Sequence, residues 1–309
     1  MLRVIISPAK KMLAGSESFA ARDVPALSGR ARVLLDALAG MDDAALQRLW
    51  HVSDRLLPSC LEALDGLRER GIPMRADDLA DPAFSSRVSP AAFAYVGLQY
   101  QSMAPGVMDE AALAWLQGHL RIVSGLYGCV RPLDAVLPYR LEMGARLAAD
   151  GGVRPDEARD LYAFWGSAIA REVVRGEGEG IRMTEGSGSA GSATTPHAAA
   201  PGAAPAPDPF ASQARPVHVV NLASVEYAKA VLPHLPELGA AYTTCVFGEA
   251  LRDGKPVQRP TASKTARGSM VRWMAEHEVD DPADLPRFDV GYRFAPELSR
   301  PGTLVFMRA

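Results

Sequence analysis

The sequence has few of the residues that hold metals, disulfides or membrane spans. Its three cysteines, Cys60, Cys129 and Cys245, lie far apart among 309 residues, which argues against a disulfide framework and for reduced thiols in a cytosol. Its six histidines show no paired ligand spacing and no Cys-x-x-Cys occurs, so we expect no metal site and no cofactor. No hydrophobic run approaches membrane-spanning length, so we expect no membrane association.

The sequence also lacks an excess of positive charge. Its formal net charge is −3, so any surface for nucleic acid must be a local patch. Hydrophobic residues make up 48% of the chain, which is ordinary for a globular protein. The strand-like run at residues 2–6 ends at Ser7-Pro8 and is too short for the apolar part of a signal peptide. We therefore expect a cytoplasmic globular protein, and the sequence indicates no obligate protein partner.

Residues 175–215 differ in composition from the rest of the chain. The segment holds 7 glycines, 5 prolines and 10 alanines, and bulky apolar side chains are almost absent. Such a segment cannot bury enough surface to offset the entropy lost on ordering. We interpret it as a disordered low-complexity insertion in a single domain, whose two parts are residues 1–174 and 216–309.

The remaining sequence predicts an α+β fold with a mixed sheet and surrounding helices. Apolar residues have helical spacing at residues 30–39, 43–50, 54–67, 110–119 and 265–278, and Ser224 precedes a further helix that ends near residue 232. Strands are expected at residues 2–6, 217–222, 290–294 and 303–307. Asp253-Gly254 predicts a hairpin between residues 241–251 and 255–259. Strands that precede helices, at residues 2–6 and 217–222, indicate parallel pairing.

The most unusual stretch is residues 120–146, which hold four arginines, three glycines, two tyrosines and two prolines. Arginines at a glycine turn are costly to bury unless an anion meets them, so the stretch predicts a phosphate-binding corner. Its tyrosines are candidates for stacking on bases. The candidate DNA- or phosphate-binding residues in this stretch are Arg121, Ser124, Gly125, Tyr127, Gly128, Arg131, Tyr139 and Arg140.

Three interpretations of this turn remain open. In a helix-hairpin-helix, one helix ends at Gly125, the next begins near Pro132, and the hairpin amides face a DNA phosphate. The usual hairpin is Gly-hydrophobic-Gly, whereas two residues separate Gly125 from Gly128. In the second interpretation, residues 120–123 form a buried strand and the glycines form a phosphate loop. In the third the turn is purely structural, and its arginines pair with Asp134 and Glu142.

Three cations elsewhere in the chain extend the prediction of a phosphate site. Lys10 follows the first expected strand, and loops at the carboxyl ends of strands commonly carry ligands. A lysine there suits a phosphate as a point charge. Lys264 and Arg267 are expected in the first turn of a helix, where cations oppose the helix dipole and are best tolerated when an anion binds the same turn. Ser224 and Glu226, at an expected strand-to-helix junction, are candidates to accompany them.

Two adjoining pieces of the stretch, SGLYGCVRPLD and PYRLEMG, are similar to the signature of the YaaA family, the peroxide stress resistance proteins. Further family-like pieces lie in matching order: ISPAKKM, VSDRL, AYVGLQ, DLYAFWG, VNLASVEYAKAV and SKTARGSMVRW. The resemblance covers nearly the whole chain apart from the insertion. It implies a bacterial cytosolic protein that protects against hydrogen peroxide. It also implies a DNA-binding module with a helix-hairpin-helix element and a basic cleft, and no firmly attached catalytic reaction.

Together these observations predict a DNA-binding protein that limits oxidative damage to DNA. Phosphate contacts dominate in this interpretation, so binding is expected to be only weakly sequence-specific. The alternative is an enzyme that acts on a nucleotide or a nucleic-acid base, with Glu142 as acid/base and Lys10 and Lys264 as phosphate binders. A third class is a redox or iron-handling factor without nucleic acid. A deep closed pocket around Glu142 favours the enzyme, and an open basic groove favours the DNA-binding protein.

Overall fold

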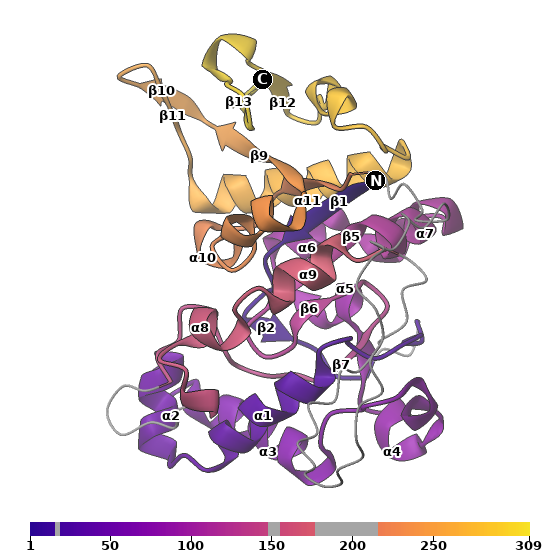
Figure 1. Ribbon diagram of the computed structural model, residues 1–309, viewed down its shortest axis with the longest axis vertical. Helices are drawn as coiled ribbons and strands as arrows, with labels where there is room; N and C mark the ends of the chain where they lie inside the picture. The colour runs from indigo at the N-terminus through magenta and orange to yellow at the C-terminus, as the bar shows by residue number, and fades with distance from the viewer. Residues whose placement is uncertain (16–18, 148–154, 177–215) are drawn as a thin grey trace, which may run out of the picture.

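A sheet of seven strands runs from one end of the molecule, where β12 and β13 lie, to its middle in the computed structural model, which describes residues 1–15, 19–147, 155–176 and 216–309 (Figure 1). Its strand order is β12-β13-β9-β8-β1-β5-β6. The strands from β13 through β5 run parallel, whereas β12 and β6 are antiparallel edge strands. The bounds are β1 (Leu2–Ile6), β5 (Leu120–Ser124), β6 (Gly128–Val130), β8 (His218–Asn221), β9 (Ala241–Gly248), β12 (Tyr292–Phe294) and β13 (Thr303–Arg308).

Strand β1 lies inside the sheet between β8 and β5, and every one of its side chains is buried. A strand covered on both faces needs a continuous apolar run, and four of the five residues of LRVII supply it. Val4 pairs with Leu120 of β5 on one side and with Val220 of β8 on the other. The sheet therefore joins strands from both parts of the chain. The expected insertion at residues 175–215 lies, from residue 177 onward, outside the described residues.

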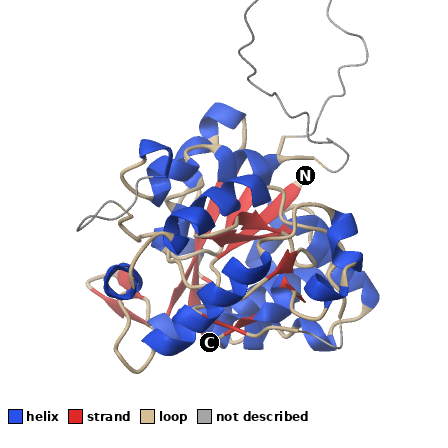
Figure 2. Ribbon diagram, turned by 90° about the horizontal axis from the view of Figure 1, so that it is seen from below, coloured by secondary structure: helices blue, strands red, loops and turns tan. Residues whose placement is uncertain are grey.

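Helices surround the sheet, as Figure 2 shows with the strands inside. Helices α1, α2 and α3 gather at the end of the molecule opposite to β12 and β13, whereas α11 lies beside α6 near the sheet (Figure 1). The helices are α1 (Ser28–Ala39), α2 (Asp43–Trp50), α3 (Leu57–Arg70), α4 (Pro82–Ser85), α5 (Ala91–Ala94), α6 (Leu98–Met103), α7 (Glu110–His119), α8 (Leu161–Trp165), α9 (Ala168–Val174), α10 (Val225–Ala228) and α11 (Pro260–Glu276).

Three small two-stranded sheets complete the fold. They pair β2 (Lys11–Met12) with β4 (Tyr95–Val96), β3 (Ser89–Pro90) with β7 (Ala135–Val136), and β10 (Ala250–Arg252) with β11 (Lys255–Val257). The last pair is the hairpin that Asp253-Gly254 predicts. It leads through residues 258–259 directly into α11.

The predicted α+β architecture with a mixed sheet is confirmed, and two helices with aspartate caps, α2 and α7, match the expected bounds. Helix α2 begins after Asp42, whose carboxylate accepts a hydrogen bond from Ala45 N at 2.7 Å. Helix α7 begins after Asp109, whose carboxylate accepts one from Ala112 N at 2.8 Å. Each cap satisfies a backbone donor that the first helical turn leaves unpaired, so a single aspartate marks the helix start.

Three predicted helix bounds were wrong. Helix α3 begins at Leu57 rather than at residue 54, and the Ser53 side chain does not cap it. Helix α10 is short and ends at Ala228. Helix α11 begins at Pro260 rather than at residue 265, because proline lacks the donor that the first helical position leaves unused. Lys264 and Arg267 therefore lie in the second turn of α11, where the helix dipole argument for them does not apply.

Residues 120–131, which we call the glycine corner, form a β-hairpin. Helix α7 ends at His119, β5 follows at once, and a tight turn leads to β6, with Ser124 paired to Gly128. Gly128 has a φ of +72°, which only glycine adopts without strain. The helix-hairpin-helix element expected here is wrong, because strands lie on both sides of the turn. Residues 120–122 form a strand rather than the end of a helix because they pair with β1.

Candidate functional site

The main candidate site is a pocket of about 490 Å³ at the carboxyl ends of the parallel strands β1 and β8. Sites outside the carboxyl ends of strands are common in such sheets, and small-molecule sites measure about 300–1,000 Å³. We call it the strand-end pocket. Its wall is built by segments spread over the chain, within residues 7–11, 96–100, 139–142, 224–227 and 264–267.

Hydrogen bonds hold the two strand ends together at the base of the pocket. Ser224 N donates to Ser7 Oγ at 2.8 Å, and the two serine hydroxyls lie 3.2 Å apart. Tyr100 of α6 donates its hydroxyl to Ser7 O at 3.0 Å. The loop that carries Lys10 is thus attached to the start of α10 and to α6, which fixes its path.

Glu142 lies between two cations in the pocket wall. Lys10 Nζ is 2.9 Å and Arg140 Nη2 is 2.8 Å from the same oxygen, Oε1 of Glu142. Within the described ranges, Oε2 of Glu142 has no hydrogen-bond partner. Lys10 is largely exposed, whereas Arg140 keeps only 15% of its side chain accessible. The carboxylate therefore orients both cations and retains a free acceptor.

Lys264 and Arg267 add positive charge that no acid among the described residues neutralises. Across the described part of the chain, neither has a carboxylate oxygen within 4.0 Å. Lys264 is exposed at the pocket, and Arg267 is partly buried. Burial lowers the pKa of Arg267, because loss of water contact disfavours the charged guanidinium. An unpaired cation held out of water is costly, and an anionic ligand would remove that cost.

Buried hydrogen-bond donors without partners surround the same space. They are Gln99 Nε2, Arg140 Nε and Arg267 Nε, and none has an acceptor among the described residues. Gln99 is only 6% exposed, yet it lines the pocket. Each of these nitrogens is closed off from the open space of the pocket, so a ligand reaches it only after the side chain that carries it turns.

Tyrosines form the inner part of the wall. Tyr100, Tyr139 and Tyr227 all line the pocket. Tyr139 is fixed by hydrogen bonds of 2.7 Å to Ser124 Oγ and 3.1 Å to Tyr95 OH. Burial raises the pKa of Tyr139 and of Tyr227, so both remain neutral phenols. They provide aromatic surface that suits a base or sugar, together with hydroxyl groups.

Glu226, the second acid of the pocket, connects α10 to the segment that holds Glu142. Its Oε1 accepts a hydrogen bond from Gly144 N at 2.8 Å, and its backbone oxygen accepts one from Tyr162 OH at 3.0 Å. An added Cβ at Gly144 would lie 3.3 Å from that same Oε1. Glu226 thus stabilises the wall through backbone contacts rather than through a cation.

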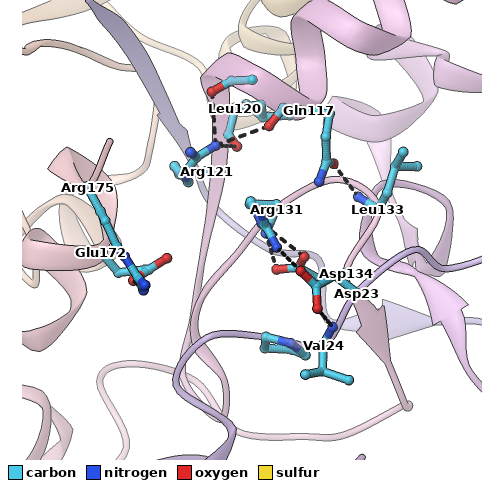
Figure 3. A network of polar contacts seen from close by, with 12 residues as sticks. Asp23, Val24, Gln117, Leu120, Arg121, Arg131, Leu133, Asp134, Glu172 and Arg175 are labelled. Atoms are coloured by element: carbon cyan, nitrogen blue, oxygen red, sulfur yellow. Dashed lines mark hydrogen bonds and ion pairs between the residues drawn. The ribbon is translucent and has the colours of Figure 1, made fainter. Parts of the chain in front are cut away.

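Arg121 does not reach this pocket. Its side chain is 4% exposed, and its Nη1 donates to Leu120 O at 2.9 Å and to Gln117 O and Gly118 O at 3.3 Å (Figure 3). The carbonyls at the end of α7 lack helical partners and carry partial negative charge, so they suit a cation. Burial lowers the pKa of Arg121. Its contacts hold α7 to β5 and leave no surface for DNA.

Arg131 lies between two aspartates, also away from the pocket (Figure 3). Its Nη2 is 2.6 Å from Asp23 Oδ2, and its Nε is 3.1 Å from Asp134 Oδ1. The Asp134 side chain is 2% exposed, and burial raises its pKa to about 7 although Arg131 opposes the effect. Pairing with Asp134 agrees with the structural interpretation of this arginine.

The remaining residues of the glycine corner lie behind the pocket. Ser124, Gly125, Tyr127 and Gly128 are buried, and a Cβ at Gly125 would lie 2.3 Å from Leu141 O. Ser124 reaches the pocket only through its hydrogen bond to Tyr139. The corner therefore supports the wall made by residues 139–142.

The strand-end pocket gathers about half of the residues that the sequence proposes for phosphate binding or catalysis. Those in its wall are Lys10, Tyr139, Arg140, Glu142, Lys264 and Arg267, and those outside it are Arg121, Ser124, Gly125, Tyr127, Gly128 and Arg131. Sequence reasoning missed Gln99, Tyr100 and Tyr227. A signal for Gln99 was present, since it ends the family-like piece AYVGLQ.

Other kinds of site are not found in the described ranges. There, no group of three or more His, Cys, Asp or Glu side chains is placed to hold a metal ion. In those same residues no helix combines the length and apolar character that crossing a membrane requires.

Comparison with known proteins identifies relatives over the full length of the chain. The family model described as peroxide stress protein YaaA matches residues 2–184 and 208–298. A UPF0246 protein of Pediococcus pentosaceus is 35% identical over 308 residues, which cover 99% of this chain and 98% of the relative. A UPF0246 protein of Lacticaseibacillus paracasei is 34% identical over 99% of both chains. One of Desulfitobacterium hafniense is 34% identical over 100% of this chain and 98% of its own.

Proposed function

The chain belongs to the peroxide stress protein YaaA family, and we propose that it acts in that response by binding DNA in the cytoplasm, with one phosphate-bearing nucleotide unit in the strand-end pocket. The DNA contacts are mainly to phosphate, so binding is weakly sequence-specific. This proposal keeps the predicted partner and moves its binding site from the glycine corner to the pocket.

The observation that carries the proposal is unpaired positive charge in a pocket of nucleotide size. Lys264 and Arg267 have no acidic partner among the described residues, and Lys10 and Arg140 share one carboxylate. Phosphate oxygens accept hydrogen bonds from ammonium, guanidinium and amide donors, and all three kinds of group line this pocket. The tyrosines of the inner wall suit the base and sugar of the same nucleotide.

An exposed basic hairpin supports DNA rather than a free metabolite as partner. Arg252 and Lys255 belong to the β10–β11 hairpin, and Arg259 precedes α11. All three side chains are exposed, and none has a carboxylate within 4.0 Å in the described ranges. The hairpin leads into the helix that carries Lys264 and Arg267, so a strand leaving the pocket meets further cations.

The test is DNA affinity measured by fluorescence anisotropy at several salt concentrations, with two unrelated sequences. If about six phosphates are neutralised, raising salt from about 50 to about 200 mM should weaken binding on the order of 10³-fold for both sequences. Lys264→Ala should weaken binding, and Arg272→Ala should not. Arg272 lies on the same helix outside the pocket and pairs with Glu276. No DNA binding by the folded wild-type protein would refute the proposal.

A second candidate function is an enzyme that acts on the bound nucleotide, and the position of Glu142 favours it. The free Oε2 of Glu142 is available to accept a proton, while the two cations at Oε1 fix the carboxylate. Glu142 lines a pocket of about 490 Å³, large enough to hold a nucleotide. Chromatography of oligonucleotides and nucleotides incubated with wild-type protein and Glu142→Gln tests it. A product that forms only with the wild type would support catalysis. Unchanged substrates would refute catalysis and support binding without a reaction.

A further inference from the structure

Three side chains that line the strand-end pocket carry buried donors without partners among the described residues. Gln99 Nε2, Arg140 Nε and Arg267 Nε are all buried, and Gln99 as a whole is 6% exposed. An internal phosphate is attached to a sugar on each side, so both neighbours would have to enter the pocket with it. A phosphate at the end of a strand, or on a free nucleotide, has one attachment and can enter alone.

The charge of the pocket also exceeds what one internal phosphate neutralises. Its wall contains the cations Lys10, Lys11, Arg140, Lys264 and Arg267 against the acids Glu142 and Glu226. A phosphodiester carries a single negative charge and two free oxygens. A phosphomonoester carries about −1.5 to −2 at neutral pH and offers three acceptor oxygens. The wall has five cations against two acids, an excess of three, which is closer to the charge of the monoester than to that of the diester.

From these two observations we propose that the strand-end pocket is specific for a phosphomonoester group on a nucleotide. The inference rests on the proposed function and names the chemical group that the pocket takes. The group has two sources, the terminal phosphate of a DNA strand and a nucleoside monophosphate. Radicals formed from hydrogen peroxide break DNA at the sugar and leave phosphate termini. Radical strand cleavage is therefore the class of reaction that supplies such a ligand under peroxide stress.

The pairing within the wall suggests how the phosphate is held. Arg140 contacts Glu142 through Nη2 and lines the pocket with 15% of its side chain accessible, so its guanidinium can face a phosphate beside Glu142. Arg267 Nε has no partner among the described residues. Lys264 lies on the same helix, α11, and also lines the pocket. Together with Gln99, these side chains approach from α6, α11 and the 139–142 segment. Such a convergent set of donors selects for a group with several acceptor oxygens.

The experiment compares labelled oligonucleotides that differ only in their ends. Short single strands and nicked duplexes carry either a terminal phosphate or a hydroxyl, and binding to the full chain is measured at constant salt. We expect the phosphate end to bind about tenfold more tightly, a ratio that corresponds to about 1.4 kcal/mol. The preference should shrink as pH falls through about 6, where the monoester takes up its second proton. Binding of the hydroxyl-ended strand should not show that transition.

Variants assign the preference to the pocket. Lys264→Ala and Arg267→Ala should lose the preference for the phosphate end, and Arg272→Ala should keep it. Lys264 is exposed, so its replacement leaves the fold intact even if Arg267→Ala is destabilised. A preference that persists in folded Lys264→Ala and Arg267→Ala would overturn the assignment.

Competition with deoxyadenosine monophosphate and with deoxyadenosine separates the two sources. Displacement of DNA by the monophosphate alone supports a phosphomonoester site that strand ends share. Tight binding of the monophosphate without any DNA binding would support the phosphomonoester site and refute DNA as the partner. Equal affinity for phosphate and hydroxyl ends would refute the phosphomonoester inference and leave the DNA-binding proposal standing.

Discussion

The ammonium group of Lys10 lies 2.9 Å from the carboxylate of Glu142, and this contact joins the loop after β1 to the segment that follows the glycine corner. Arg140 shares the same carboxylate oxygen. One acid therefore orients two cations without neutralising both, while Lys264 and Arg267 face the same pocket without an acid of their own among the described residues. This unequal pairing is the basis of the phosphate-binding account.

Replacing Glu142 with Gln should leave the fold stable and should maintain or increase affinity for DNA. Ion pairs as exposed as the one to Lys10 contribute only about 0–1 kcal/mol, so the melting temperature should change little. Removal of a negative charge from the wall should favour a phosphate. Thermal melts and anisotropy titrations check both results. A tenfold loss of affinity in folded Glu142→Gln would instead show that this carboxylate contacts the ligand.

Gly268→Ala should destabilise the protein and disturb the pocket. An added Cβ would lie 2.0 Å from Gln99 O, so α11 and α6 must separate, at a cost of about 1–3 kcal/mol. Gly29→Ala in α1 is the control, because no atom lies within 4 Å of its added Cβ and alanine favours a helix. Urea unfolding of both variants measures the difference. Equal stability of the two would contradict the close packing of α11 on α6.

Arg131→Ala should impair folding and spare DNA binding. Above about pH 7, where Asp134 is ionised, the substitution leaves its buried carboxylate without a cation, which costs on the order of 3 kcal/mol. Because Arg131 lies outside the pocket, the protein that remains folded should bind DNA with wild-type affinity and an unchanged salt slope. Urea unfolding and anisotropy titrations provide the two readouts. Weakened DNA binding by Arg131→Ala with wild-type stability would instead place the phosphate site at the glycine corner.

The pH dependence of stability should include a contribution from Asp134. Burial raises its pKa from 3.8 in the unfolded chain to about 7 in the folded protein. Between these values the folded protein keeps a proton that the unfolded chain has released. The free energy of unfolding therefore decreases as pH rises from about 4 to about 7. Asp134→Asn should flatten this slope relative to the wild type, as measured by urea unfolding across the range. Parallel slopes would contradict the raised pKa.

The sequence predicts the sheet and the well-marked helices because their signals are local. A continuous apolar run defines β1, and Asp42 and Asp109 mark the starts of α2 and α7. The glycine corner stayed open between helix and strand because its apolar residues fit both equally well, and the choice is made by pairing with β1. Pairing with a strand so distant in the sequence cannot be predicted from the spacing of neighbouring apolar residues.

The candidate site was predictable only in part for a similar reason. Lys10 follows a strand end, where ligands commonly bind, and the family resemblance supports it. Arg121 and Arg131 carry the same charge, but backbone carbonyls of α7 satisfy the first and Asp23 and Asp134 satisfy the second. Sequence spacing does not reveal which arginines find partners inside the fold. The contribution of Gln99 likewise depends on the packing of α6 against α11.

The position of a phosphate in a complex with DNA tests the central claim most directly. A crystal structure of the protein with a short oligonucleotide bearing a terminal phosphate would supply it. The account predicts the phosphate in the strand-end pocket, within hydrogen-bonding distance of Lys264 Nζ and of the Arg267 guanidinium, with a base or sugar against the tyrosines. DNA bound elsewhere on the surface, with no phosphate in the pocket, would contradict it.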